Sequence, residues 1–376
     1  MRILHVAESV KGGCGTYINQ LVHAQLADPN VESVHVVLPD AHVVQVPDIP
    51  EPNRTLFTSR GRSFASLWAL WQATARVLEA FQPDCVHLHS TFAGAVGRIG
   101  MALQRNRPSI VYCAHGWAFD IAGSPIKRGA MALAERVLSH GCEGVIAISE
   151  YERNRGVAVG IAPDRIVTVL NGITDAPPAS QHDLPALHHE RPADEPRRVL
   201  FIGRLDRQKG IDTLLSALDG LAEKVALRII GSAVVGDQAA FAYDRPGVTM
   251  LGWGDDRYIR EQLAWADCVV IPSRWEGFGL VALEAMRAGR AVIASNVGGL
   301  PEVLDPTVTG WLVPPDDPVS LRATLLSLSD AQLTTAGAAG RRRFVQQFTI
   351  ERTAKALSSV YRQAIAMRAS ISHAFA

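Results

Sequence analysis

Short apolar runs that alternate with longer stretches of helical periodicity dominate the pattern of this chain. The first half carries RILHVAE, SVHVVLP, DCVHLH, SIVYCAH and GVIAIS, followed by IVTVLNGI. The second half repeats the pattern with RVLFIGRL, ALRIIGS, VTMLGW, DCVVIPS, AVIASN and TGWLVPP. Such runs, bounded by turn residues, are typical of strands buried in parallel sheets, and the alternation indicates βαβ units. We therefore expect an α/β fold with two doubly wound, Rossmann-like domains that face a central cleft.

The segment between the two series differs in composition. Residues 175–198, DAPPASQHDLPALHHERPADEPRR, are rich in proline, histidine and charge, which favours a linker. We expect an N-terminal domain over 1–175, a linker over 176–197 and a C-terminal domain over 198–350. Residues 351–376 carry no strand pattern, so we expect a C-terminal helix that packs back on the N-terminal domain.

Composition excludes several classes of protein. Of the 376 residues, 48% are apolar and 20% are charged, which suits folded domains rather than a disordered chain. Lysine plus arginine and aspartate plus glutamate number 37 each, so no overall field recruits nucleic acid. We expect no nucleic-acid partner.

Cysteine use and the N-terminus both favour the cytoplasm. The five cysteines form no CxxC pair, and several lie in or beside apolar runs, which predicts buried free thiols in a reducing compartment. The opening MRILHVAES reaches an acid at Glu8, too early for the apolar core of a signal peptide. No window of 18 residues is apolar and uncharged. We expect a cytoplasmic protein that can still sit on the inner face of the cell membrane.

A glycine-rich loop follows the first predicted strand. In ESVKGGCGTYINQL, Gly12, Gly13 and Gly15 precede an amphipathic helix, so the backbone can approach a ligand and leave helix amides free for an anion. The spacing is not GxGxxG, and a dinucleotide fingerprint is only weakly supported. A tight strand-to-helix turn is the alternative.

A cationic loop opens the second series. FIGRLDRQKGID lacks the GK[ST] ending of a Walker loop, which leaves Arg204 and Lys209 beside a strand end and a helix start. Two cations there can hold a pyrophosphate and take up the charge that develops when it leaves. Surface salt bridges to Asp206 or Asp212 are the alternative.

Two carboxylates bracket another predicted helix start. In PSRWEGFGLVALEAMRAG, Glu276 falls in the turn and Glu284 on the second helical turn, with the backbone amides of residues 277–280 between them. The amides suit an anion and the carboxylates suit hydroxyl groups on either side of it. A nucleotide-activated sugar has this layout, whereas an isolated acidic pair is more often a solvated helix face.

Four segments together resemble a known family. EGFGLVALE resembles the E-x7-E motif of the retaining, glycogen-synthase-like family four glycosyltransferases, which have the GT-B fold, and GRLDRQKG resembles their G-R-L-x-x-x-K-G loop. NVGGLPEVL is similar to the family's next glycine-rich turn and GGCGTY to its N-terminal loop. The matches occur in family order, and jointly they are specific.

The resemblance implies roles for individual residues. Arg204 and Lys209 would bind the donor diphosphate, Glu276 would hold hydroxyls of the transferred sugar, and Glu284 would accept hydrogen bonds from the ribose. Further donor contacts would come from backbone and ring groups at Gly13, Gly15, Gly252, Trp253, Phe278, Gly279 and Leu280. Gly252 and Trp253, in MLGWGDD, correspond to the base-contacting loop, although Trp253 packing as an ordinary apolar residue is the alternative.

The catalytic candidate in the N-terminal half is His115. It lies in AHGWAFD, where the family places a histidine beside the reacting anomeric carbon, and it would hydrogen-bond the sugar or the acceptor without attacking that carbon. A histidine satisfied in a strand-end turn is the alternative. His5, His87 and His89 also lie near strand ends, but acids with ligand spacing are absent and no DxD triplet occurs, so we expect neither a metal nor another cofactor.

A local excess of positive charge bears on the identity of the acceptor. Residues 54–128 carry nine cations against three acids, and SRGRSFASLWALWQATARVL places arginines beside Trp68 and Trp71. Such a segment suits an anionic leaflet that presents a polyprenyl-linked saccharide, while a helix packed on the sheet with a solvated basic end is equally compatible.

The expected reaction is therefore transfer of a hexose or N-acetylhexosamine from a nucleotide-diphospho-sugar, with UDP favoured over GDP, to a saccharide or lipid-linked saccharide hydroxyl. The alternatives are another GT-B activity, such as a sugar-nucleotide epimerase, or an inactive subunit that only binds nucleotide sugars. The front loop argues against a NAD-linked oxidoreductase, and no cofactor-lysine context supports a phosphorylase.

Overall fold

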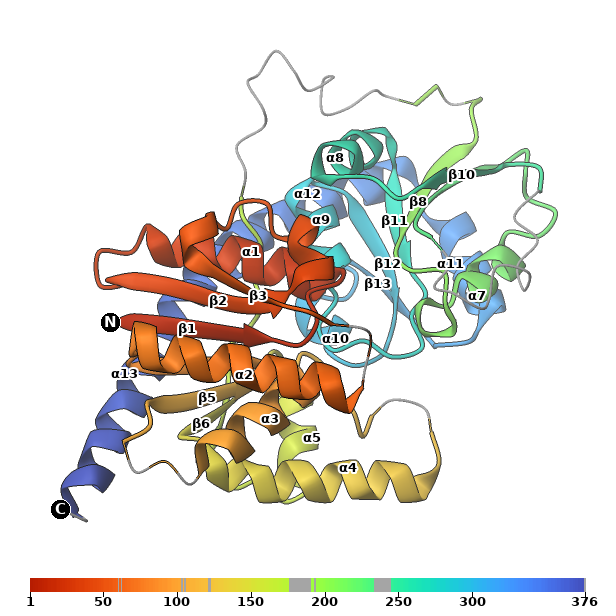
Figure 1. The fold of residues 1–376 in the computed structure, drawn as a ribbon. Helices are drawn as coiled ribbons and strands as arrows, with labels where there is room; N and C mark the ends of the chain where they lie inside the picture. Colours follow the sequence, from red (N-terminus) through yellow and green to blue (C-terminus); the bar gives the residue numbers. More distant parts are fainter. Residues whose placement is uncertain are drawn as a thin grey trace. The chain divides into compact units, whose positions relative to one another are not determined.

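The computed structural model describes residues 1–59, 61, 63–102, 104, 106–120, 123–175, 191–192, 194–232 and 245–374. The chain divides into two compact units (Figure 1). Unit 1 comprises Met1–Thr174 and Ile350–Ala376, and unit 2 comprises Asp175–Thr349. Residues 176–190 and 193 of the expected linker lie outside the described residues.

Unit 1 is built on a seven-stranded parallel sheet in the order β3-β2-β1-β4-β5-β6-β7. Its strands are β1 Arg2–Ala7, β2 Ser33–Pro39, β3 Arg54–Phe57, β4 Cys85–His89, β5 Ser109–Cys113, β6 Gly144–Ala147 and β7 Ile166–Thr168. The predicted apolar runs form six of these strands. The sequence analysis missed β3, a four-residue edge strand whose run RTLF is too short to stand out. The strand order reverses between β1 and β4, which is where doubly wound sheets bind ligands.

Helices cover both faces of this sheet. They are α1 Gly13–Leu26, α2 Phe64–Phe81, α3 Thr91–Ala102, α4 Pro125–Leu138, α5 Glu150–Ala158 and α13 Ile350–Ala374, with short helices η1 Asp40–Gln45, η2 Glu51–Asn53 and η3 Ser139–Gly141. The C-terminal helix α13 packs on α1 and on β4 and β5. Its first residue donates its N–H to the carbonyl of Ile173 at 3.0 Å, and its buried face includes Leu357 and Tyr361.

Unit 2 contains a six-stranded parallel sheet in the order β10-β9-β8-β11-β12-β13. The strands are β8 Arg197–Ile202, β9 Val225–Ile230, β10 Val248–Gly252, β11 Cys268–Ile271, β12 Ala291–Ser295 and β13 Gly310–Val313. The helices are α7 Ile211–Ala217, α8 Asp256–Trp265, α9 Leu280–Arg287, α10 Leu300–Val303, α11 Pro318–Ser327 and α12 Asp330–Gln347, with η4 at Arg207–Lys209. Each predicted run of the second half forms one strand. The order again reverses, here between β8 and β11, so the expectation of two doubly wound sheets is confirmed.

The cysteines were expected to be buried free thiols, and no stretch of the chain was expected to cross a membrane. All five cysteines are free thiols, and four are buried, namely Cys85, Cys113, Cys142 and Cys268. Burial raises the pKa of Cys85 and of Cys268 to about 12, so these thiols are unreactive. Among the described residues, no helix combines the length and the apolar character needed to cross a membrane.

Candidate functional site

The glycine-rich loop of unit 1 lies at the carboxyl end of β1. Helix α1 begins at Gly13, its N-cap Gly12 provides no side-chain cap, and its first turn contains no acid. A Cβ on Gly15 would lie 2.0 Å from the carbonyl oxygen of Val10, so close approach of the two backbones requires glycine there. The loop is therefore both a tight turn and an uncapped helix start. The amides at this end of α1 favour an anion.

A polar pair joins the two strands at the reversal of unit 1. The hydroxyl of Ser90, which follows β4, donates to Glu8 Oε2 at 2.9 Å, and Glu8 follows β1. Ser90 holds a left-handed backbone, with φ of 72°. Non-glycine residues rarely adopt this conformation, and it often marks a functional turn. Sequence reasoning had not singled out Ser90.

His115 lies two residues beyond the end of β5 and also has a left-handed backbone, with φ of 54°. Its Nε2 lies 2.9 Å from His89 Nδ1, and its ring meets the edge of Tyr17 on α1 at 5.1 Å between centroids. Burial lowers the pKa of His115 to about 4, so the imidazole is neutral near pH 7. A neutral imidazole can accept a hydrogen bond through one nitrogen and donate through the other.

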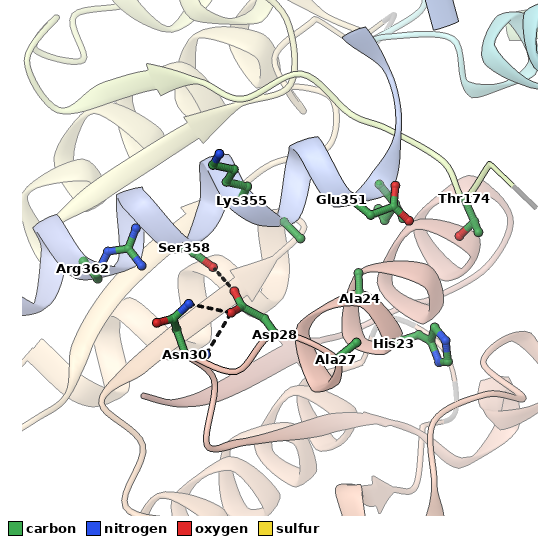
Figure 2. A pocket seen from close by; sticks show the side chains of 12 residues that line it. His23, Ala24, Ala27, Asp28, Asn30, Thr174, Glu351, Lys355, Ser358 and Arg362 are labelled. Carbon is green, nitrogen blue, oxygen red and sulfur yellow. Dashed lines mark hydrogen bonds between the residues drawn. The ribbon is translucent and has the colours of Figure 1, made fainter. Parts of the chain in front are cut away.

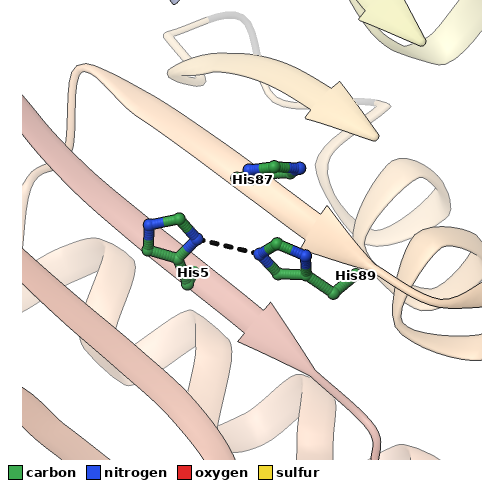
Figure 3. Close-up of side chains that lie close together, drawn as sticks. All are labelled: His5, His87 and His89. Carbon is green, nitrogen blue, oxygen red and sulfur yellow. Dashed lines mark hydrogen bonds between the residues drawn. The ribbon is translucent and has the colours of Figure 1, made fainter. Parts of the chain in front are cut away.

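Three further histidines are buried near His115. Figure 3 shows His5 on β1 and His87 and His89 on β4, all buried, with one ring nitrogen of each within 4.8 Å of the others. His5 Nδ1 and His89 Nε2 are 2.8 Å apart. His87 Nδ1 lies 2.7 Å from the hydroxyl of Tyr361 on α13.

The cationic loop of unit 2 follows β8. Lys209 Nζ lies 2.6 Å from Glu276 Oε2, and both side chains are largely buried. Arg204 is half exposed, pairs with Asp206 at 3.2 Å and donates to Gln208 Oε1 at 2.6 Å. The salt-bridge alternative therefore describes Arg204, whereas Lys209 pairs with the first of the two candidate carboxylates.

The loop after β11 holds Glu276 in place through its backbone and its side chain. A Cβ on Gly298, where φ is 57°, would lie 1.7 Å from the carbonyl oxygen of Glu276, so only glycine lets this second turn pack there. Gly299 donates its N–H to the same carbonyl at 3.3 Å. The hydroxyl of Ser273 donates to Glu276 Oε2 at 3.3 Å. These contacts explain why the sequence NVGGLPE accompanies EGFG.

Arg274, which sequence reasoning missed, ties the two loops together. Its guanidinium forms two bonds to the carboxylate of Asp212 at 2.9 and 2.7 Å, and donates to the carbonyl of Arg207 at 2.8 Å. It also pairs with Asp316 at 2.5 Å. The loops after β8 and β11 are thereby fixed to each other at the strand reversal. The available signal was an arginine directly before WEGFG and an acid directly after QKGI.

The start of α9 lies close to a partly buried carboxyl, that of Glu284. Its N-cap is Gly279, with φ of 98°, no side-chain cap is present, and the first turn, which begins at Leu280, contains no acid. Phe278 is buried beneath this turn. Burial raises the pKa of Glu284 to about 7, Asp256 raises it further, and Arg287 and Lys209 oppose the rise.

Gly252 ends the edge strand β10, and Trp253 follows it. The carbonyl of Gly252 accepts from the N–H of Gly231 at 2.8 Å, and the side chain of Trp253 is 53% exposed. The exposure argues against Trp253 as an ordinary packed residue and leaves its ring available to stack on a planar ligand.

The structure groups the predicted residues by unit. Gly13, Gly15 and His115 belong to unit 1, and the others belong to unit 2. Within unit 2, Lys209 and Glu276 are in direct contact, and Lys209 is close enough to influence the pKa of Glu284.

A cavity of about 550 Å³ opens elsewhere in unit 1, between α1 and α13 (Figure 2). Asp28 in its wall accepts from the backbone and the side chain of Asn30 at 2.9 Å, and these hydrogen bonds lower the pKa of Asp28. The carbonyl of Asn30 also accepts from the N-terminal amine at 3.0 Å, so the cavity adjoins the amino end of β1. The glycine-rich loop and His115 follow the carboxyl ends of strands, and the cavity is separate from them.

Comparison with known proteins finds a matching family model for each unit. Residues 11–176 match the family model described as Glycosyltransferase Family 4, and residues 196–331 match the model described as Glycosyl transferases group 1. The chain is 32% identical over 317 residues to an uncharacterized 41.2 kDa protein in the cps region of Klebsiella pneumoniae, covering 83% of this chain and 86% of that protein.

Two solved structures are similar over nearly their whole length. Sucrose-phosphate synthase from Thermosynechococcus elongatus has a TM-score of 0.78 and 25% identity, covering 98% of this chain and 100% of that one. Anabaena Alr3699/HepE, solved in complex with UDP and glucose, has a TM-score of 0.75 and 22% identity, covering 96% and 99%. The second likeness is one of fold.

Proposed function

Since this chain belongs to glycosyltransferase family 4 and has the GT-B fold, we propose that it is a retaining glycosyltransferase that moves a hexose or N-acetylhexosamine from a nucleotide-diphospho-sugar to a hydroxyl of a saccharide or polyprenyl-linked saccharide. UDP is favoured over GDP, and transfer needs no metal. The observation that carries the proposal is the contact of Lys209 with Glu276 where the strand order of unit 2 reverses, next to the uncapped start of α9.

The diphosphate is bound by unit 2. Lys209 and Arg204 supply positive charge, and the amides of Phe278, Gly279 and Leu280 supply neutral donors at the positive end of α9. When the bond between the anomeric carbon and the phosphate oxygen breaks, negative charge grows on the leaving group. Cations and amides already in place stabilise that charge without reorganising, which lowers the barrier.

The two carboxylates bind hydroxyl groups. Glu276, paired with Lys209, accepts from hydroxyls of the transferred sugar, and Glu284 accepts from the ribose. A carboxylate that accepts from a hydroxyl forms a stronger bond than a neutral acceptor does. Gly252 and the exposed ring of Trp253 contact the base, and the amides at Gly13 and Gly15 complete the donor contacts from unit 1.

Transfer occurs on one face of the sugar. The acceptor oxygen forms its bond to the anomeric carbon on the side from which the phosphate leaves, and the acceptor proton passes to the leaving phosphate oxygen. His115 hydrogen-bonds the sugar or the acceptor hydroxyl and thereby orients it. The K. pneumoniae relative from a cps region supports a saccharide acceptor, and the HepE complex, with UDP and glucose bound to the same fold, supports a UDP-sugar.

A donor screen tests this function. Purified protein is incubated with a panel of UDP- and GDP-sugars, with and without saccharide and polyprenyl-phosphate-linked acceptors, and nucleotide release is measured. We expect release from at least one UDP-sugar, with the anomeric configuration kept in the product. Conversion of the donor to another sugar nucleotide would indicate an epimerase. Donor binding without nucleotide release would indicate an inactive subunit. Failure of every donor to bind would contradict the proposal.

The raised pKa of Glu284 predicts that donor binding depends on pH. With a pKa of about 7, Glu284 is mostly protonated at about pH 6, whereas ribose hydroxyls favour the carboxylate. Binding should therefore release a proton, and affinity for UDP-glucose should rise up to about tenfold as the pH rises from about 6 to about 8. Titration calorimetry in two buffers of different ionisation enthalpy measures both effects.

The matched control for this effect is Glu284→Gln, which keeps the shape but cannot ionise. Proton release should disappear in this variant, and its affinity should be nearly independent of pH. The diphosphate diester of UDP-glucose does not titrate in this range, so the ligand adds no pH dependence of its own. An unchanged pH dependence in Glu284→Gln would assign the titration to another group.

We also propose that unit 1 contacts an anionic membrane through the layer formed by α2, α3 and α4. Figure 1 shows these helices along the same side of the unit 1 sheet. Exposed apolar side chains on the layer are Phe64, Trp68, Ile99, Ile126, Leu133 and Val137. Exposed cations accompany them, among them Arg76, Lys127 and Arg136. Arg60, Arg62 and Arg105 of the predicted basic segment lie outside the described residues.

The two tryptophans of this segment differ. Trp68 is 54% exposed, whereas the ring of Trp71 packs on Gly100 of α3, where an added Cβ would lie 2.3 Å from it. Trp71 is therefore a packing residue, and the membrane role rests on Trp68 and Phe64. An exposed aromatic ring beside basic side chains suits the headgroup region of an anionic leaflet.

Vesicle sedimentation tests the membrane contact. We expect the protein to bind vesicles that contain phosphatidylglycerol and not vesicles of phosphatidylcholine alone, and binding should fall several-fold in Trp68→Ser. Val319→Ser, which alters a 75% exposed side chain on α11, should bind as the unaltered protein does. Equal binding by the Trp68 and Val319 variants would exclude this surface.

A further inference from the structure

A continuous line of hydrogen-bonded side chains leads from the interior of unit 1 to His115. Gln25 Oε1 on α1 lies 2.7 Å from His5 Nε2, and His5 Nδ1 lies 2.8 Å from His89 Nε2. His89 Nδ1 then lies 2.9 Å from His115 Nε2. Each imidazole uses both ring nitrogens except His115, whose Nδ1 forms the end of the line.

The imidazoles of this line are neutral. Burial lowers the pKa of His5 to about 4 and that of His115 to about 4, and it lowers the pKa of His89 well below its ordinary value. A neutral imidazole carries one N–H and one bare nitrogen, so each can donate in only one direction along the line.

We propose that Gln25, His5 and His89 are positioning residues that fix the tautomer of His115. An amide oxygen can only accept, so His5 donates from Nε2 to Gln25 and must accept at Nδ1. His89 then donates from Nε2 and accepts at Nδ1, and His115 in turn donates from Nε2. His115 Nδ1 is left as a bare acceptor.

A metal ion at His5, His87 and His89 is the alternative use of this cluster, because their ring nitrogens lie within 4.8 Å of one another. Two nitrogens bound to one tetrahedral Zn²⁺ at about 2.0–2.1 Å would be roughly 3.3 Å apart. His5 Nδ1 and His89 Nε2 are closer, at 2.8 Å, which is the spacing of a hydrogen bond with a proton between them. The geometry favours hydrogen bonding.

The tautomer decides what His115 can do, and this step rests on the function proposed above. With Nδ1 bare, His115 accepts from a hydroxyl of the sugar or the acceptor and leaves the hydroxyl oxygen free to react. In the reversed arrangement each imidazole would carry its proton on Nδ1, and His115 would donate instead. Gln25 favours the first arrangement because the reversed one would place the bare Nε2 of His5 against the amide oxygen.

The test combines nitrogen NMR with kinetics on the full chain. Spectra of protein with ¹⁵N-labelled histidine distinguish protonated from bare ring nitrogens. In the unaltered protein, His5, His89 and His115 should each show a protonated Nε2 and a bare Nδ1. Any other tautomer at these residues would overturn the proposal without any variant. A change of the histidine signals on addition of Zn²⁺ that a chelator reverses would overturn it as well.

Variants then separate positioning from packing. Gln25→Met has similar size but no acceptor, so the line should reverse, His115 should become protonated at Nδ1, and kcat should fall about tenfold with the donor KM unchanged. Gln25→Glu retains an acceptor and should keep the original tautomer and most of kcat. Thr74→Val removes a different buried polar group of unit 1, a hydroxyl that donates to the carbonyl of Leu70 at 2.8 Å, and should change neither the His115 tautomer nor kcat.

The readouts distinguish this proposal from the function on which it rests. An unchanged His115 tautomer in Gln25→Met would overturn control by Gln25. A reversed tautomer with unchanged kcat would uphold the control and instead contradict the acceptor role of His115 in transfer.

Discussion

Replacing Lys209 by alanine is expected to lower kcat/KM by roughly 10- to 150-fold, since a charge-assisted contact is worth about 1.5–3 kcal/mol. The variant loses the cation that would face the diphosphate. It also leaves Glu276, 2.6 Å from Lys209 Nζ, without its counter-charge. Steady-state kinetics with a UDP-sugar, together with nucleotide affinity from calorimetry, measure the effect.

Two further variants interpret the loss. If only the unpaired charge left on Glu276 were responsible, adding Glu276→Gln to Lys209→Ala would restore donor affinity; we expect the double variant to remain impaired. Lys224→Ala removes an exposed lysine directly before β9, at the amino end of that strand and away from the carboxyl ends that carry Lys209 and Glu276, and should have no effect. Unchanged turnover in Lys209→Ala would exclude a role with the leaving group.

Replacing His115 should abolish detectable transfer, a loss of at least about 100-fold, while nucleotide binding stays nearly intact. The nucleotide contacts proposed above come chiefly from unit 2, whereas His115 belongs to unit 1. Product formation and nucleotide affinity are measured on the same preparations. Equal loss of both would indicate a structural histidine.

The backbone of His115 determines which variant is informative. At φ of 54°, alanine is disfavoured, whereas asparagine tolerates the left-handed conformation. His115→Asn should therefore be inactive yet nearly as thermally stable as the unaltered protein, and His115→Ala should be inactive and less stable. His23→Ala, an exposed histidine on α1 outside the hydrogen-bonded line, is the matched control and should retain activity.

Several site residues were accessible from the sequence because their motifs are local. EGFGLVALE places a carboxylate in a turn, free amides at a helix start and a second carboxylate one turn later, and the structure has Glu276, Gly279 and Glu284 in those positions. A helix start exposes its amides whatever surrounds it. The roles of these residues toward a donor remain predictions.

Contacts across the sheet were not accessible from sequence. Lys209 and Glu276 are 67 residues apart, and they meet because β8 and β11 are neighbours in the sheet. Arg274 reaches Asp212 for the same reason. Arginines and acids near strand ends are common, and the apolar pattern does not say which strands are adjacent.

By itself, the sequence determined that this protein has two series of buried parallel strands, and it indicated which loops carry charge, since strand pattern and helix starts depend on neighbouring residues. Only the tertiary structure decided that Lys209 pairs with Glu276 and that His5, His89 and Gln25 form a line ending at His115. The sequence placed these histidines near strand ends but did not show that they are hydrogen-bonded to one another. The order in which strands enter a sheet is set by packing of the whole unit, and that order determines which polar groups share one buried space.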